Sequence, residues 1–483
     1  MKKIVLAGAI PDALRHALSA SLPVSVFDGV LTDPDSIAAA LADADALIYA
    51  PPIPDVHEAG RTIGDLLRGG YQLFKAASEN AATRRVVLLS TLRFFARMPQ
   101  NWRVHTGWRP RPSTDPSELM PYLTECSVRE LTRASGRFNA SGGLHTTVLR
   151  LNPETDTQKT VDFLKASLEK PYPEHHSCSF RILHAGDIEG RPPATGAPFT
   201  EVLAPTDPIP SRPLRRVVLF GAAGPVQAAT AQELARDYVL RLSDVRTMAE
   251  VRADGKRQSP FAPLPVPPEE LPPSRFEMPH DEFTLDIADP DAVLAACADG
   301  DAILNGSVLR HEPVAAFRVN AQGVYNLCRA AVAHRIRRLV QTGPLQTQGH
   351  SEDDYSWDWA VDNPPARPGR SLYAHSKYLG QEIARVFAEN HDLSVPNLLY
   401  TQFVSPEARP GWGSAMLVTW DDSARALRAA LEVSPEQLGS PYEEFQISVT
   451  VPQDTFRYDR ARRILGWTPQ DDLSYLWQEP TDA

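Results

Sequence analysis

Short apolar runs alternate with longer segments of helical spacing along both halves of the chain. The first half has such runs at residues 3–8, 43–49, 84–91 and 146–150, and the second half at residues 216–220, 238–244, 301–305 and 337–340. Most of these runs end at, or just before, a glycine or a polar residue, which is typical of a buried strand followed by a loop and a helix. Strands and helices that alternate at this spacing predict a parallel, doubly wound α/β sheet in each half.

The two halves resemble each other. Residues 69–77 followed by 84–91 line up with residues 323–331 followed by 337–344 when one inserted residue is allowed. A proline-rich stretch over residues 190–213 separates the two copies and has the composition of a linker. We therefore expect a first domain over residues 1–189, a linker over 190–213 and a second domain over 214–483.

The second copy carries a glycine turn between its first strand and the helix that follows. Gly221, Ala223 and Gly224 lie in this turn, where backbone N–H groups can approach a pyrophosphate at a helix N-terminus. The next strand ends at Asp244, close to the spacing at which an acid binds the ribose hydroxyls of a dinucleotide. Asp244 favours NAD. Arg241 and Arg246 flank it and are candidates for binding a 2′-phosphate, so NADP stays open as the alternative.

Tyr373 and Lys377 are four residues apart in an alanine-rich segment of helical pattern, and such residues share one helix face. A lysine cation beside a phenol favours the phenolate and lowers the pKa of the tyrosine toward the working range of a general acid or base. The pair therefore predicts proton-transfer chemistry in the second domain.

With these motifs in place, the second half resembles an extended short-chain dehydrogenase/reductase of the NAD-dependent epimerase/dehydratase type. Further matching segments are residues 285–287, 301–306, 319–331, 337–340 and 461–469, so that the resemblance covers most of residues 214–470. It implies two tandem Rossmann-like domains, an NAD(P)-dependent oxidoreductase or epimerase, and a small polar or sugar-like substrate whose hydroxyl or carbonyl carbon exchanges hydride.

The resemblance also assigns roles to individual residues. Tyr373 would exchange the hydroxyl proton, Lys377 would bind the nicotinamide ribose as well as lower the tyrosine pKa, and Thr342 would hold the substrate oxygen. The remaining cofactor contacts would come from Asp286 and Ile287, which border the adenine, and from Asn305 and Gly306.

Each copy departs from the family pattern. Residues 8–12 of the first copy lack the second glycine, and Cys126 stands four residues after Tyr122 where lysine is expected, so we interpret this copy as non-catalytic. In the second copy, Gln227 replaces a third glycine and Pro344 replaces the family serine or threonine, for which Thr342 or Thr347 would substitute. The competing hypothesis is a nucleotide-binding or scaffolding protein that has lost turnover.

Composition narrows the class of partner. The chain has 483 residues, a formal net charge of −11 and a pI near 5.7, which disfavours nucleic acid or an anionic membrane as partner. Without an apolar run long enough to span a bilayer, the expectation is a cytoplasmic protein, with a homodimer as one open assembly. The four cysteines have no paired spacing, and the cluster formed by Glu174, His175, His176 and Cys178 is interpreted as a polar loop, so no metal is expected.

Overall fold

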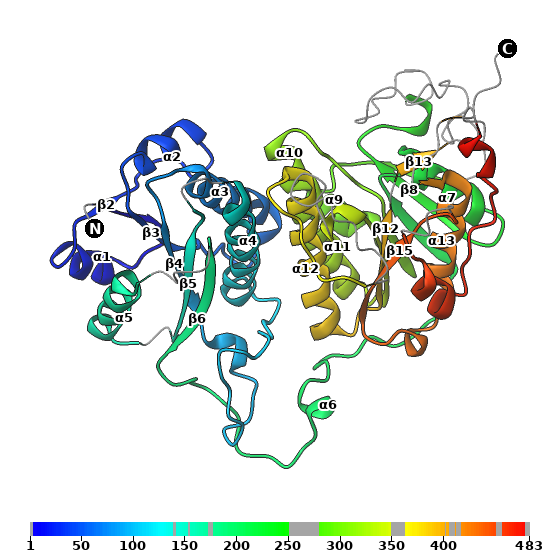
Figure 1. Cartoon of the computed structure of the whole chain (residues 1–483). Coiled ribbons are helices and arrows are strands. Elements are labelled where there is room, and N and C mark those ends of the chain that lie inside the picture. Colours follow the sequence, from blue (N-terminus) through cyan, green and yellow to red (C-terminus); the bar gives the residue numbers. More distant parts are fainter. Residues whose placement is uncertain are drawn as a thin grey trace. The chain divides into compact units, whose positions relative to one another are not determined.

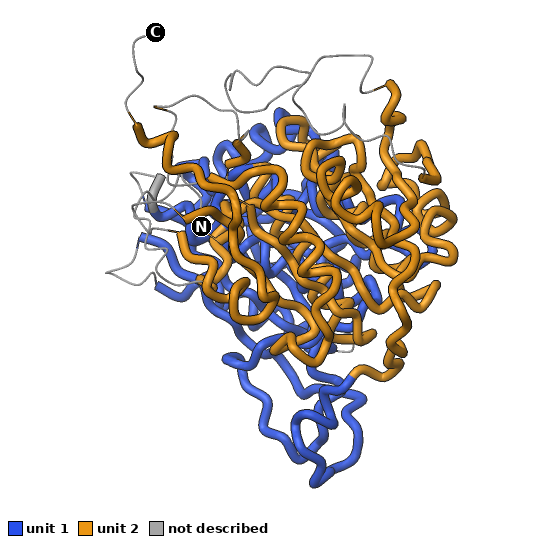
Figure 2. The backbone as a smooth tube through the Cα atoms, turned by 90° about the vertical axis from the view of Figure 1, so that its right-hand side faces the viewer, with its two compact units in different colours: residues 1–204, 368–371 blue, residues 205–367, 372–483 orange. Residues whose placement is uncertain are grey.

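The computed structural model describes residues 3–138, 142–152, 155–171, 177–250, 280–348, 363–400, 402–404, 411, 417–450 and 456–478. The chain divides into two compact units, residues 1–204 with 368–371 and residues 205–367 with 372–483 (Figure 2). The main boundary, between Ala204 and Pro205, falls inside the linker expected at residues 190–213.

Unit 1 is a parallel sheet with helices on both faces (Figure 1). Its described strands lie in the order β2-β1-β3-β4-β5-β6, with bounds β1 Ile4–Gly8, β2 Val24–Val26, β3 Ala46–Ala50, β4 Arg85–Thr91, β5 His145–Leu151 and β6 Ser179–Ala185. One face is covered by α1 (Asp12–Ser19) and α5 (Thr157–Glu169). The other carries α2 (Pro34–Leu41), α3 (Ala59–Glu79) and α4 (Pro116–Phe138), and the short α6 (Phe199–Val202) follows.

Unit 2 repeats this plan with a larger parallel sheet. Its described strands lie in the order β9-β8-β7-β10-β11-β12-β15, with bounds β7 Arg216–Phe220, β8 Val239–Asp244, β9 Asp281–Thr284, β10 Ala302–Asn305, β11 Arg338–Pro344, β12 Val395–Tyr400 and β15 Tyr442–Ile447. A separate pair of strands is formed by β13 (Gln402–Val404) and β14 (Leu417–Thr419).

The helices of unit 2 form two layers (Figure 1). One layer is α7 (Pro225–Leu234) with α13 (Trp420–Glu432), and the other is α9 (Pro290–Ala296), α10 (Pro313–Phe317), α11 (Gly323–Ala333) and α12 (Leu372–His391). A π-helical turn over Arg318–Gln322 joins α10 to α11. The layered parallel sheets confirm the predicted doubly wound α/β class in both units.

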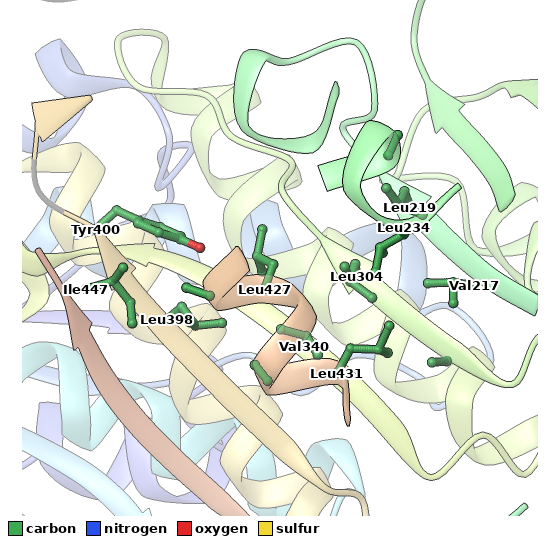
Figure 3. Packing of buried hydrophobic residues seen from close by; sticks show 14 of the residues in the cluster. Val217, Leu219, Leu234, Leu304, Val340, Leu398, Tyr400, Leu427, Leu431 and Ile447 are labelled. Carbon is green, nitrogen blue, oxygen red and sulfur yellow. The ribbon is translucent and has the colours of Figure 1, made fainter. Parts of the chain in front are cut away.

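The core of unit 2 lies between the sheet and the layer of α7 and α13. Val217 and Leu219 of β7, Leu304 of β10 and Val340 of β11 pack there with Leu427 and Leu431 of α13 (Figure 3). These strand residues are fully buried, as expected for a parallel sheet covered on both faces. The apolar runs seen in the sequence therefore produce the scaffold that fixes the strand ends.

The order of the strands in unit 2 indicates where a ligand would bind. In unit 2 the chain passes from β7 to β8 on one side and reaches β10 on the other, so that neighbouring loops diverge at the carboxyl ends of β7 and β10. Ligands of open α/β sheets bind in the crevice at such a switch point. The glycine turn after β7 and the residues after β10 meet here.

Candidate active site

The glycine turn after β7 is as tight as its sequence predicts. Gly221 has a φ of +73°, and a Cβ at this position would lie 2.7 Å from the backbone nitrogen of Ser307. Helix α7 then begins with Gly224 as its N-cap, and no side chain caps it. The uncapped first turn leaves backbone N–H groups at the helix N-terminus, which is the arrangement that binds a pyrophosphate.

Asp244 ends β8 beside this turn. Its carboxylate accepts hydrogen bonds from the backbone N–H groups of Ala223, at 2.9 Å, and Val245, at 2.7 Å. Burial raises the pKa of Asp244, whereas these hydrogen bonds and the charge of Arg246 oppose the rise. Its place at the strand end fits a partner for ribose hydroxyls.

Arg241 does not take the role that the sequence allowed it. Its guanidinium donates to the backbone carbonyls of Ala296 and Ala298, both at 2.7 Å, and stacks on Phe283. Side chains alternate between the two faces of a sheet along a strand. Residues 241 and 244 are three positions apart in β8, so their side chains project from opposite faces. Arg241 is therefore a structural residue, and Arg246 alone remains as a candidate for a 2′-phosphate.

Gln227 is accommodated by the absence of a side chain at Gly306. A Cβ on Gly306 would lie 2.3 Å from Cγ of Gln227, so the glycine makes room for the glutamine side chain. Gln227 is 1% exposed, and neither of its amide atoms has a hydrogen-bond partner among the described residues. The Gly306 backbone N–H donates to the Phe220 carbonyl at 2.9 Å, which keeps the two loops together. The glutamine thus replaces a glycine without displacing the turn.

Lys377 reaches the same place from α12. Its ammonium donates to the backbone carbonyls of Ser307, at 2.8 Å, and Thr342, at 3.4 Å. Burial lowers the pKa of Lys377 to about 7, and the charge of Arg310 acts in the same direction. The lysine therefore lies at the carboxyl ends of β10 and β11, next to the glycine turn, and titrates close to neutral pH.

Tyr373 lies one turn earlier on α12 and is accompanied by a cation that the sequence did not suggest. The guanidinium carbon of Arg310 lies 5.0 Å from the centre of the Tyr373 ring. Burial raises the pKa of Tyr373, and the charge of Arg310 and a hydrogen bond from it oppose this rise. The structure thus differs from the expectation of a lysine-depressed phenol, because burial dominates and Arg310 is the cation that counteracts it.

The threonines proposed to hold the substrate oxygen are engaged elsewhere. The Thr342 hydroxyl donates to the Asn305 carbonyl at 3.0 Å, so only its backbone carbonyl meets Lys377. Thr347 is fully buried and donates to the Pro344 carbonyl at 3.0 Å. The expectation that Thr342 donates to substrate is therefore not supported by its hydrogen bonding, and Thr347 does not replace it.

Asn305 begins a row of polar side chains across four neighbouring strands. Asn305, Gln341, Asn397 and Glu444 are register partners on β10, β11, β12 and β15. Asn305 donates to Gln341 at 3.0 Å, and its own side-chain oxygen accepts the Ser307 N–H at 3.1 Å. This row fixes the start of the segment that Lys377 binds. Sequence reasoning missed it because the row exists only once the strand registers are known.

Asp286 and Ile287 follow β9, beyond Asp244 in the strand register. Asp286 is exposed and accepts the Ala288 N–H at 2.9 Å. Ile287 is buried against Gly323, where a Cβ would lie 2.7 Å from its side chain. Both residues lie at the carboxyl end of the sheet, on the side of Asp244, where the resemblance placed the adenine.

Several sequence features lie outside the described residues. They are the histidine pair at 175 and 176, the proline-rich segment at 259–273, and Trp357 and Trp359. Within the described ranges, no group of three or more His, Cys, Asp or Glu residues is arranged to hold a metal ion. A search of the same ranges finds no helix that is long and apolar enough to cross a membrane.

Comparison with known proteins places this site in a family. Residues 217–431 match the profile of the NAD dependent epimerase/dehydratase family. This region, a little under half of the chain, is similar to that family. The match spans the glycine turn, Asp244, Tyr373 and Lys377, so the family resemblance stated from the sequence is confirmed for unit 2. NAD, the cofactor expected from the sequence, is the one that the family's description names.

Two curated relatives come from Haloferax volcanii. L-arabinose 1-dehydrogenase (NAD(P)(+)) is 24% identical over 54% of this chain and 98% of its own length. NAD-dependent glucose-6-phosphate dehydrogenase is 23% identical over 39% of this chain and 76% of its own length. Solved structures include uronate dehydrogenase from Agrobacterium tumefaciens, at 22% identity, a TM-score of 0.43 and coverage of 56% of this chain and 91% of that chain.

Proposed function

We propose that unit 2 is an NAD-dependent oxidoreductase or epimerase that acts on a hydroxyl or carbonyl carbon of a small, sugar-like substrate. The observation that carries the proposal is the position of Lys377. It lies on one face of α12 with Tyr373, and its ammonium is fixed on the Ser307 carbonyl beside the glycine turn. The sugar dehydrogenases among the relatives support the substrate class.

The residues present fit a dinucleotide. The turn from Gly221 to Gly224 and the uncapped start of α7 would hold the pyrophosphate, and Asp244 would accept the ribose hydroxyls. Bound NAD would supply the acceptor or donor of hydride. Tyr373 would take up or release the substrate hydroxyl proton at its phenolic oxygen. Lys377 would donate to the nicotinamide ribose from its place on the Ser307 carbonyl.

A second candidate function is nucleotide binding without turnover, and it is favoured by one observation. The hydroxyls of Thr342 and Thr347 both donate to backbone carbonyls, so neither is a ready donor to a substrate oxygen. If the purified full chain binds NADH but reduces no member of a panel of sugar lactones and carbonyl compounds, this second function is the better description.

NADH fluorescence tests the proposal directly. We expect saturable binding with one site per chain. In unit 1 the equivalent turn has Ile10 buried in the core and Pro11 at the N-cap of α1, which leaves no second glycine after Gly8 for close pyrophosphate approach. The absence of saturable binding contradicts the proposal, and two equivalent sites per chain contradict the assignment of the cofactor to unit 2 alone.

Asp244→Ala tests the cofactor orientation. The substitution removes the acceptor that would bind the 2′-hydroxyl of NAD, and it also removes a repulsion against the 2′-phosphate of NADP. It therefore weakens the binding of NADH more than the binding of NADPH. Asp281→Ala, an exposed carboxylate at the opposite end of β9, is the control and leaves both affinities unchanged. An equal effect of Asp244→Ala on the two cofactors shows that the ribose is bound elsewhere.

A further inference from the structure

Arg310 places a positive charge beside the Tyr373 phenol of the proposed site. Its guanidinium stacks on the Tyr373 ring, with 5.0 Å between the guanidinium carbon and the ring centre. Its charge also reaches Lys377, whose pKa it helps to lower. Two cationic side chains, Arg310 and Lys377, therefore act on one small region around Tyr373.

Hydrogen bonds hold the backbone of the residues that precede Arg310. The preceding residue, Leu309, donates its N–H to the side-chain oxygen of Asn320 at 3.3 Å, and its carbonyl accepts from the Asn320 side-chain nitrogen at 2.7 Å. The same nitrogen donates to the Ser376 hydroxyl on α12 at 3.0 Å. Ser307, three residues before Arg310, is bound by Lys377. The arginine is thus preorganised against α12.

No carboxylate of the described residues pairs with Arg310, and its Nε is buried without a hydrogen-bond partner. Two other arginines of unit 2 that lie partly inside the protein are neutralised by carboxylates, whereas Arg241 donates to backbone carbonyls. Arg425 pairs with Asp422 at 2.6 Å, and Arg460 pairs with Glu443. An unneutralised guanidinium next to a second cation is electrostatically unfavourable, and an added anion relieves it.

The cofactor's pyrophosphate is not the anion that this arrangement requires. The glycine turn and the first turn of α7 are the groups suited to a pyrophosphate, whereas Arg310 contacts the ring of the tyrosine that faces the reacting hydroxyl. The anion that reaches Arg310 must therefore belong to the molecule that approaches Tyr373.

We propose that Arg310 is the anion-binding residue of this site and that the substrate carries a carboxylate or a phosphate near its reacting carbon. A guanidinium presents parallel N–H donors that match either group. This inference rests on the proposed function and narrows its substrate class from sugar-like to anionic sugar-like compounds. It makes Arg310 a specificity-determining residue, in addition to its effect on the Tyr373 pKa.

The test uses the full-length chain saturated with NADH, so that the pyrophosphate site is already filled. Acetate and inorganic phosphate are titrated at constant ionic strength, with chloride as the reference anion, and dissociation constants come from thermal shifts. At least one of the two anions binds more tightly than chloride. Tighter acetate binding indicates a carboxylate in the substrate, and tighter phosphate binding indicates a phosphate.

Arg310→Gln removes the charge, and the preferred anion then binds about 10–100-fold more weakly, the usual worth of a charged hydrogen bond. The matched control is Arg329→Gln, because Arg329 also stacks on a tyrosine, Tyr325, at 5.8 Å but is exposed on α11. The control keeps wild-type anion binding. At pH 6, below the Lys377 pKa of about 7, both variants keep the NADH affinity of the wild type.

Two results contradict the inference: wild-type protein that binds neither anion better than chloride, and Arg310→Gln that retains the preference. The first comparison needs no variant, so it decides the question even if Arg310→Gln does not fold. Failure of the wild type to bind NADH in the separate titration is a different outcome, because it removes the proposed function itself.

Discussion

The two units differ in how the buried polar side chains near their strand ends are satisfied. In unit 1, Ser90 of β4 and Arg150 of β5 are register partners. Arg150 donates twice to the Glu125 carboxylate, at 2.9 and 2.7 Å, and the Ser90 hydroxyl donates to the same carboxylate at 2.6 Å. All three residues are buried, so this cluster satisfies itself.

Aromatic rings complete the enclosure in unit 1. The Arg150 guanidinium lies 5.6 Å from the ring centre of Phe94 and 5.5 Å from that of Phe95. Tyr122 and Cys126, which stand where unit 2 has Tyr373 and Lys377, are 5% and 1% exposed. The interior of unit 1 is thus filled by its own charges and rings, which supports its interpretation as a non-catalytic copy.

In unit 2 several buried polar groups near the proposed site lack side-chain partners of this kind. Lys377 has carbonyl partners, whereas Nε of Arg310 and both amide atoms of Gln227 have no hydrogen-bond partner within the part of the chain that the structure describes. Buried polar groups are normally paired, and exceptions concentrate where a ligand supplies the missing partner. We infer from this contrast that the satisfied polar cluster stabilises unit 1 and that the unsatisfied groups of unit 2 are available to a ligand.

The largest expected effect is on turnover. Tyr373→Phe removes only the proton-carrying oxygen, so the rate of an identified reaction falls by roughly 10²–10⁴-fold while NADH affinity stays close to wild type. Tyr122→Phe makes the same change at the equivalent position of unit 1 and leaves the rate unaltered. Near wild-type turnover by Tyr373→Phe, measured by absorbance of NADH, overturns the assignment of the acid–base group.

Breaking the ion pair of unit 1 has the next largest effect, and it acts on stability alone. Arg150→Met leaves the buried Glu125 carboxylate without its partner and destabilises the unit by about 3–5 kcal/mol. Lys75→Met disrupts only an exposed pair with Glu79 on α3 and costs less than about 1 kcal/mol. Urea unfolding measures both, and NADH titration shows no change in either variant if the two units have separate roles.

The pairing of Gly306 with Gln227 gives a smaller, testable effect in unit 2. Gly306→Ala places a Cβ against the glutamine side chain, and such overpacking costs about 1–3 kcal/mol and weakens NADH binding. Adding Gln227→Ala removes the clash, so the double variant recovers most of the lost stability. Simple additivity of the two changes in urea unfolding shows that the contact is not the cause.

Much of the fold could be predicted because it depends on local patterns. The apolar runs that became β7, β8, β10 and β11 were recognisable, as was the glycine turn, since only glycine readily adopts the positive φ seen at Gly221. The main boundary between the units lies within the proline-rich stretch, whose composition is also a local pattern of the sequence. Alternation along β8 contained the information that Arg241 and Asp244 face opposite sides, although the sequence interpretation did not use it.

What the sequence did not reveal depends on contacts between distant segments. Arg310 meets Tyr373 only because Asn320, on a π-helical turn, fixes the segment after β10 against α12. No periodicity marks that contact. The hydrogen bond from Thr342 to Asn305 likewise requires the pairing of β10 with β11. Local pattern therefore identified the catalytic candidates, and tertiary packing decided their electrostatics.

The smallest expected effect is a dependence of NADH affinity on pH. It distinguishes unit 2 from unit 1 because it arises from Lys377, and unit 1 has Cys126 at the equivalent position. The lysine is protonated below its pKa of about 7 and loses its charge as the pH rises. Since the ammonium form is the better donor and attracts the cofactor's negative charge, NADH binds more tightly at low pH. The dissociation constant rises by less than tenfold per pH unit between pH 6 and pH 8.5, the limit for one linked proton.

Two variants test whether Lys377 causes this dependence of NADH affinity on pH. Lys377→Met has a weaker affinity that no longer varies with pH, and Arg310→Gln shifts the profile to higher pH because it removes a charge that lowers the lysine pKa. Calorimetry in buffers of different ionisation enthalpy should detect uptake of up to one proton per NADH bound near pH 8. A profile that is the same in Lys377→Met and wild type assigns the titration to another group, and with it the role of Lys377 in cofactor binding fails.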